Sequence, residues 1–395
     1  MASGRALATA ALLGAVAAGL LAAAPAHAAP GYPPTYTAGE PAVAVAGPSL
    51  VYLEQISTGY LRDAATGRPL TPEPLVVRRR CSGVVVNPDG YVATTTVCVR
   101  PSDAIVLVNA LYRYGRDQVA AKRLAPDRLD AFVTAATPTS MFTGAAPGSR
   151  YAVGLLAQTG VATPELVGDP AVPATVVGSQ PPDAGNVALV RLGRTGLPAV
   201  ELGGSGAPAA ILGYARSPNG TYAVRGRSVT VTGRTGTGRL GLTGDVGPDS
   251  RGGAVVDATG RLVGLLDTDP SANGEPVHDV VDPSHLTRLL ARHGVPNRLA
   301  DVDRAYRTGL DAYFHGRYSA AVAGFSDVLR RDGTRTAAVT YRDRARDRLA
   351  TEGNATPNAA DWGRYALSAA LGTVIVVALL RLSTVVRVLV RRHPG

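Results

Sequence analysis

Histidine, lysine and cysteine are scarce in this chain of 395 residues, and each scarcity excludes a kind of chemistry. No histidine lies between His27 and His278, Lys122 is the only lysine, and the two cysteines are Cys81 and Cys98. A metal site needs clustered ligands, and a phosphate loop needs a GxxxxGK pattern. Neither pattern is present, and no glycine-rich stretch leads into the helix of a dinucleotide fingerprint. We therefore expect no metal and no cofactor.

The first 28 residues predict a secretory signal peptide. Arg5 precedes the apolar run ATAALLGAVAAGLLAAA, and Ala26-His27-Ala28 forms a small-residue cleavage site before Ala29. A retained membrane anchor is the alternative interpretation. Export would place both cysteines in an oxidising compartment, where a disulfide persists.

A second apolar run, residues 365–380, predicts a transmembrane helix over 362–382. The run is shorter than the roughly 20 residues of a usual span, but Trp362 and a snorkelling Arg381 would extend it. A buried core helix is the alternative. Arginines without acidic residues follow in the tail, 383–395, so the positive-inside rule places this tail in the cytoplasm. We therefore expect a single-pass protein of the cell membrane with most of its chain outside.

The formal net charge of +10 raises the question of nucleic-acid binding. The positive charges are dispersed, and the tightest cluster is Arg78-Arg79-Arg80. An exported protein rarely meets nucleic acid, so these charges favour a solvated surface. We expect the membrane and a protein or peptide as partners, and no nucleic acid.

Between the two ends, composition divides the chain into segments. Residues 29–48 are rich in proline and alanine and predict a linker or extended arm. Residues 49–290 contain short β-branched runs separated by turn signals such as Asn219-Gly220, which predict a barrel or sandwich. A helical insertion over 102–124 interrupts them.

After residue 290 the composition becomes helical, and residues 300–350 predict a small helical module. Gly309, Gly316, Tyr318, Ala321 and Phe325 have the spacing of a tetratricopeptide repeat. A third helix over 336–350 would pack on the pair, and the polar segment 351–361 would form a stalk. We expect the aromatic residues to face inward and to leave the opposite face of the first helix free. A generic helical hairpin is the alternative.

Three motifs follow one another along the chain: CSGVVVNPDGYVATTTVCV, GNVALVRL and DVGPDSRGGAVVD. The first predicts a hairpin whose outer ends bring Cys81 and Cys98 within reach of a disulfide. Together the motifs resemble the trypsin-like (chymotrypsin-fold) serine proteases, in wording most of all the HtrA-type and actinobacterial branches. The resemblance implies a mainly β fold over 49–290, with two six-stranded β-barrels divided near 170–180.

The same resemblance implies that all three positions of the catalytic triad are replaced. The histidine position falls on Val97, the aspartate position on Asn186 and the nucleophile on Arg251. None of these side chains can act as a general base or as the nucleophile that the family uses. Asp249 takes the place of the glycine whose N–H faces the oxyanion, where a carboxylate would disfavour a negatively charged intermediate.

A one-residue shift would instead make Ser250 the nucleophile and Arg251 an insertion. This alternative needs a base, but His278 and His285 lie beyond the strand that follows the loop. A serine–lysine dyad would need Lys122, which we expect at the surface of the insertion.

The resulting hypothesis is a membrane-anchored extracytoplasmic pseudoprotease that binds a protein or peptide at the outer face of the membrane. Binding would use the former substrate groove or the helical module. The first alternative is an active serine endopeptidase that uses Ser250. The second is a structural spacer that presents the tetratricopeptide-like module.

Restoring the triad should not by itself create a protease. We expect the triple variant Val97→His, Asn186→Asp, Arg251→Ser to stay nearly silent toward peptide esters, because Asp249 remains beside the oxyanion site. Loss of one oxyanion donor costs about 3 kcal/mol, or roughly a hundredfold in rate. Adding Asp249→Gly should give the larger gain. Robust hydrolysis by the unmodified protein, abolished by Ser250→Ala, would contradict this alignment.

Overall fold

The computed structural model describes residues 36–355, apart from 38, 205, 235–238, 244–245 and 271–275. The expected signal peptide (1–28), transmembrane helix (362–382), cytoplasmic tail (383–395) and most of the stalk lie outside the described residues. Within the described part, none of the helices combines the length and apolar character needed to cross a membrane. The chain divides into two compact units, and their described parts are residues 36–310 and 311–355.

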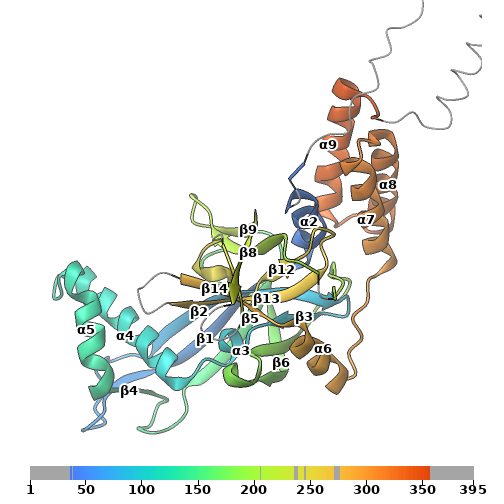
Figure 1. Ribbon diagram of the computed structural model, residues 1–395. Helices are drawn as coiled ribbons and strands as arrows, with labels where there is room; N and C mark the ends of the chain where they lie inside the picture. The colour runs from blue at the N-terminus through green and yellow to red at the C-terminus, as the bar shows by residue number, and fades with distance from the viewer. Residues whose placement is uncertain are drawn as a thin grey trace, which may run out of the picture. The chain divides into compact units, whose positions relative to one another are not determined.

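The first sheet of the larger unit closes into a barrel of antiparallel strands (Figure 1). Its strands are β1 (Leu50–Asp63), β2 (Leu75–Asn87), β3 (Tyr91–Thr94), β4 (Ser140–Thr143), β5 (Ala152–Gln158), β6 (Val172–Gln180) and β7 (Val187–Leu192). The order is β2-β3-β7-β6-β5-β1-β4, and β2 also pairs with β1, which closes the ring and leaves β4 outside it. Alternate residues such as Leu53, Val85 and Val190 point inward and form its core.

The second sheet is open. Its strands are β8 (Ala210–Arg216), β9 (Tyr222–Ser228), β10 (Val231–Arg234), β11 (Leu240–Leu242), β12 (Ala254–Val256), β13 (Leu262–Pro270) and β14 (Pro276–Val281). Their order is β10-β11-β14-β13-β12-β8-β9. The expected pair of six-stranded barrels is therefore one closed barrel and one half-barrel. Strands β10 and β11 are short and contain Gly233 and Gly241, and glycine weakens a strand interior.

The boundary between the two sheets lies later than the sequence predicted. Residues 172–180 form β6 of the first barrel, and the barrel continues to the end of β7 at Leu192. The connection therefore spans 193–209. Leu50 and Tyr52 of β1 share one hydrophobic core with Leu212 and Tyr214 of β8, so the two sheets pack directly on each other.

The expected linker over 29–48 is in part a helix. Residues Gly39–Ala46 form α2, and Gly47–Ser49 form the short 3₁₀ helix η1. Ala42 and Ala46 are fully buried in the core that both sheets share. Alanine has the highest helix propensity, and its small side chain lets the helix pack closely on the sheets. These two effects outweigh the tendency of the neighbouring prolines to prevent a helix.

The helical insertion is longer than 102–124. Helix α4 (Asp103–Ala120) is capped by Ser102, and η2 (Pro126–Arg128), α5 (Leu129–Ala136) and η3 (Thr137–Thr139) follow it. Leu111 of α4 and Val133 of α5 share a hydrophobic cluster with Leu61 of β1 and Val77 of β2. The insertion thus packs on the outer ends of β1 and β2.

Four helices follow the sheets: α6 (Pro283–Arg292), α7 (Asp301–Phe314), α8 (Tyr318–Arg331) and α9 (Thr336–Glu352). Tyr318, Ala321 and Phe325 are buried, as expected, and rings of Tyr313 and Tyr341 pack around them. The helical module is therefore present, with its third helix slightly longer than predicted. Its likeness to a tetratricopeptide repeat stays a prediction.

The first half of α7 belongs to the larger unit and contacts it. The Tyr306 hydroxyl donates to the Ala44 carbonyl at 3.2 Å, and Arg307 pairs with Glu201 at 3.1 Å. Asp303 accepts the backbone N–H of Ala199. Because this half of the helix contacts the larger unit, the face that we expected to be free for partner binding does not extend over it.

The predicted disulfide between Cys81 and Cys98 is confirmed. We expect the double variant Cys81→Ala, Cys98→Ala to lower the free energy of unfolding by about 3 kcal/mol, since the bridge restricts the unfolded chain. Thermal unfolding of oxidised protein would measure the loss. Adding a reductant should destabilise the native protein and leave the double variant unchanged. Two free thiols in the native protein, detected by mass spectrometry, would contradict the bridge.

Candidate functional site

Two of the expected site residues meet although they are far apart in the sequence. Val97 lies in the short helix α3 (Thr96–Val99), and Asn186 directly precedes β7. The Val97 backbone N–H donates to Asn186 Oδ1 at 3.4 Å. Asn186 has a φ of +50°, a conformation that asparagine tolerates better than most residues. The hairpin and the β7 motif thus converge at one point, as the alignment requires.

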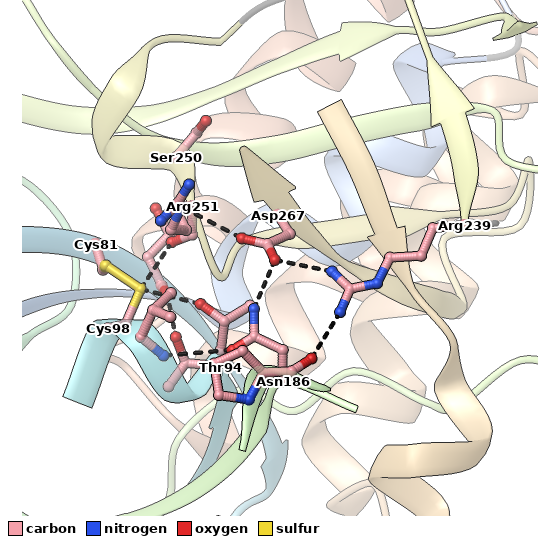
Figure 2. A network of polar contacts seen from close by, with 12 residues as sticks. Cys81, Thr94, Cys98, Asn186, Arg239, Ser250, Arg251 and Asp267 are labelled. Atoms are coloured by element: carbon pink, nitrogen blue, oxygen red, sulfur yellow. Dashed lines mark hydrogen bonds and ion pairs between the residues drawn. A yellow bond between two sulfur atoms is a disulfide. The ribbon is translucent and has the colours of Figure 1, made fainter. Parts of the chain in front are cut away.

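Asp267 of β13 connects Asn186 to the third expected position (Figure 2). Asn186 Nδ2 donates to Asp267 Oδ2 at 2.5 Å, and Arg251 Nε lies 3.3 Å from Asp267 Oδ1. Arg239 Nη1 donates to Asp267 Oδ2 at 3.0 Å. The Asp267 residue is only 7% exposed, so a buried carboxylate holds these side chains together. We call Asn186, Arg239, Arg251 and Asp267 the Asp267 network.

A further arginine, Arg79 of β2, contributes positive charge to this network. Burial and the nearby Arg251 together lower the pKa of Arg79 to about 10, although Asp267 opposes the shift. Arg79 Nε is buried without a hydrogen-bond partner among the described residues. Arg79 thus adds a guanidinium near the carboxylate of Asp267.

The backbone around Arg251 is fixed against the first barrel. The Arg251 carbonyl accepts the N–H of Ser82 at 2.8 Å and lies 3.6 Å from Cys98 Sγ. Gly252 has a φ of +79°, and a Cβ there would lie 2.2 Å from Thr94 Oγ1. The glycine after Arg251 is thus required by the close approach of this loop to the hairpin.

Ser250, the alternative nucleophile, is fully buried. Its hydroxyl donates to the Gly247 carbonyl at 2.5 Å, and its Cβ would lie 2.5 Å from a Cβ added at Gly213. Figure 2 shows its side chain pointing away from Asn186 and Asp267. In this conformation the hydroxyl cannot reach a substrate carbonyl at the Asp267 network.

Asp249 precedes Ser250 in the 3₁₀ helix η5 (Pro248–Ser250). Burial raises the pKa of its carboxyl, and Arg80 and Arg216 oppose the shift. The Asp249 carbonyl accepts the Ser82 hydroxyl at 2.9 Å. Its carboxyl is therefore near two arginines, and its effect on an oxyanion stays a prediction.

The histidines and the lysine lie apart from Ser250, as far as their side chains are described. His285 of α6 lies 3.1 Å from Gln180 Oε1, against Gly185, and lines a cavity of about 430 Å³ together with Arg239. The side chain of His278 lies outside the described residues. Lys122 follows α4 and is exposed, as expected. No metal-ligand cluster is found in the described part of the chain.

The site lies where a closed antiparallel barrel meets a second antiparallel sheet, which places the chain among two-sheet β proteins. A family model described as "Trypsin-like peptidase domain" matches residues 159–265. This match includes the GNVALVRL and DVGPDSRGGAVVD motifs and bears out the resemblance to trypsin-like peptidases over that part of the chain.

One similar solved structure is titled "Crystal structure of the serine endoprotease from Yersinia pestis". The similarity covers 66% of this chain and 67% of that chain, at 15% identity and a TM-score of 0.37. No curated protein matches this chain.

The sequence analysis missed Asp267, Arg239 and the role of Arg79. A weak signal was available for Asp267, because an acidic residue directly follows the apolar run GRLVGLL and would otherwise be an odd occupant of a buried strand. Nothing in the local sequence marks Arg239 or Arg79 as neighbours of that carboxylate.

Replacing Asn186 by aspartate would put two carboxylates in contact. We expect Asn186→Asp to lower the free energy of unfolding by about 2 kcal/mol or more at pH 7, because the like charge is buried. The neighbouring charge raises the pKa of the new carboxyl in the folded state. The loss is therefore present at neutral pH and disappears below the unfolded pKa of about 4.

Urea unfolding between pH 3 and pH 8 would measure this dependence. The charge exchange Asn186→Asp, Asp267→Asn is the matched control and should recover much of the loss at pH 7. A single variant as stable as the native protein at every pH would contradict the contact. The same clash adds a second obstacle to restoring the triad.

Proposed function

We propose that this protein is a membrane-anchored extracytoplasmic pseudoprotease that acts by binding a protein or peptide. The Asp267 network carries the proposal. It occupies the point where the α3, β7 and η5 segments meet, and its contacts join an amide, a carboxylate and guanidinium groups. Its two arginines are partly exposed and offer positive charge to a ligand, but the network holds no proton acceptor next to a nucleophile.

The active-endopeptidase alternative requires a large rearrangement. Ser250 would have to break its bond to Gly247, turn toward the opposite side of the loop and meet a base. His285 is the histidine whose described side chain lies nearest to Asn186, and it contacts Gln180 and Arg288. We therefore favour binding over catalysis. The membrane anchor and the outward orientation rest on the two apolar segments and the basic tail.

A fluorophosphonate probe and fluorescent casein test the absence of catalysis. We expect no labelling and no casein hydrolysis by the full chain, because Ser250 is buried and lacks a base. A catalytically active trypsin-like protease in the same buffer is the positive control. Labelling that disappears in Ser250→Ala would overturn the proposal and establish an endopeptidase.

Crosslinking in membranes followed by mass spectrometry separates binding by the β domain from the spacer alternative. Partner crosslinks within residues 49–290 support the pseudoprotease, and crosslinks confined to 300–350 support a spacer that presents the helical module.

A further inference from the structure

The first barrel is open between β5 and β6. Strand β5 pairs with β6 only at Leu156 and Ala157. Before these residues β5 pairs with β1 alone, and beyond the contact β6 pairs with β7. Val153 of β5 and Val176 of β6 both line a cavity of about 650 Å³. The cavity therefore lies where the wall of the barrel is incomplete.

This cavity lies at one end of the barrel interior. Leu53 points inward, and side chains alternate between the two faces of a strand, so Gln55 and Ser57 also point inward. Ser57 lies opposite Val153 in the register of β1 and β5, so both side chains face the same side. Ser57 is 1% exposed, but Val153 is 60% exposed. The side chains of the described residues thus leave this end of the barrel unfilled.

Gln55 contributes an unsatisfied polar group to the cavity. The residue is only 2% exposed and is one of those that line the cavity. Its Nε2 donates to Ser57 Oγ at 2.8 Å, but its Oε1 accepts no hydrogen bond within the described residues. A buried polar atom without a partner destabilises the fold. A ligand that donates an N–H to Gln55 Oε1 supplies the missing bond.

Two arginines lie at the outer part of the cavity. Arg100 follows α3 and Arg150 precedes β5, and both are exposed. Arg100 Nη1 donates to Ser179 Oγ at 3.4 Å, and neither arginine forms an ion pair in the part of the chain that the structure describes. Asp103 is the acidic residue of the lining and accepts the Tyr151 hydroxyl at 2.8 Å. Besides these residues and Gln55, the lining is apolar: Val99, Pro101, Val153 and Val176.

We propose that this cavity binds an N-acylated amino acid with an apolar side chain, either as a free molecule or as the C-terminal residue of a peptide. Its carboxylate pairs with Arg100 and Arg150. Its amide N–H donates to Gln55 Oε1, and its side chain packs on the valines of the lining. A simple fatty acid offers the carboxylate and the apolar chain but lacks the N–H.

Isothermal titration calorimetry with N-acetyl-leucine and the full chain in nanodiscs tests the proposal. We expect saturable binding that weakens at high salt, since salt screens exposed charges. Three analogues each remove one feature: N-acetyl-leucine amide lacks the charge, N-acetylglycine lacks the apolar side chain, and O-acetyl leucic acid lacks the N–H. Each should bind about tenfold more weakly or worse. Absence of saturable binding, or an analogue that binds as tightly as N-acetyl-leucine, overturns the proposal.

A peptide that ends in Ala-Ala-Leu distinguishes the two sources of this chemistry. Binding at least as tight as that of N-acetyl-leucine identifies a protein C-terminus as the ligand. Much weaker binding of the peptide identifies a free acylamino acid. The same peptide with a C-terminal amide is the matched control and should bind more weakly than the peptide acid.

The variant Val153→Asp locates the site. It places a negative charge in the cavity at an exposed position, so we expect the protein to stay folded and N-acetyl-leucine binding to weaken about tenfold or more. The matched control Val161→Asp changes a valine that is 63% exposed and lies outside the cavity, and it should bind normally. Thermal unfolding verifies that both variants are folded. Unchanged binding by Val153→Asp would exclude the cavity.

A second variant, Arg100→Gln with Arg150→Gln, tests recognition of the carboxylate. We expect binding of N-acetyl-leucine to fall about tenfold or more and binding of its amide to stay unchanged, because only the acid carries a charge. Arg123→Gln changes an exposed arginine outside the cavity and should have no effect. A double variant that still prefers the acid contradicts the role of the two arginines.

This site is separate from the Asp267 network, because none of the network residues lines the cavity. Failure of the inference is therefore distinguishable from failure of the proposed function. If N-acetyl-leucine does not bind but partner crosslinks map to residues 49–290, the cavity assignment is wrong and the binding function stands. If the fluorophosphonate probe labels Ser250, the proposed function fails whatever N-acetyl-leucine does.

Discussion

The buried carboxylate of Asp267 is the constraint on which the candidate site depends. A charge removed from water must be paired or its burial destabilises the fold. Asp267 meets this requirement with Asn186 from the first barrel and with Arg239 and Arg251 from the second sheet. Asn186 and Arg251, which stand at two of the expected triad positions, are thus parts of one electrostatic arrangement around Asp267.

Sequence patterns predicted correctly those structural features that residues close together in the chain determine. Hairpin spacing was sufficient for the Cys81–Cys98 bridge, and motif alignment brought Val97 beside Asn186. Helix α2 was missed because alanine propensity and burial against both sheets outweighed a proline-rich composition. The open second sheet and the place of Asp267 depend on pairings between distant strands, which single-sequence periodicity does not encode.

The helical insertion contributes more to the surface than its predicted length suggested. By packing Leu111 and Val133 on the ends of β1 and β2, it places arginines of α4 in one cavity with residues of β2. The insertion therefore forms part of the wall of that cavity and contributes positive charge to it.

Gly252 illustrates how the architecture of a fold, and not only a reaction, can require a sequence signature. Its left-handed backbone conformation and its close approach to Thr94 are required where the loop packs on the hairpin between the two sheets. These demands hold whether or not a nucleophile precedes it. A glycine pair in this context, found in a genome search, consequently indicates the fold. The residue before the pair must be examined separately before the protein is classed as an enzyme.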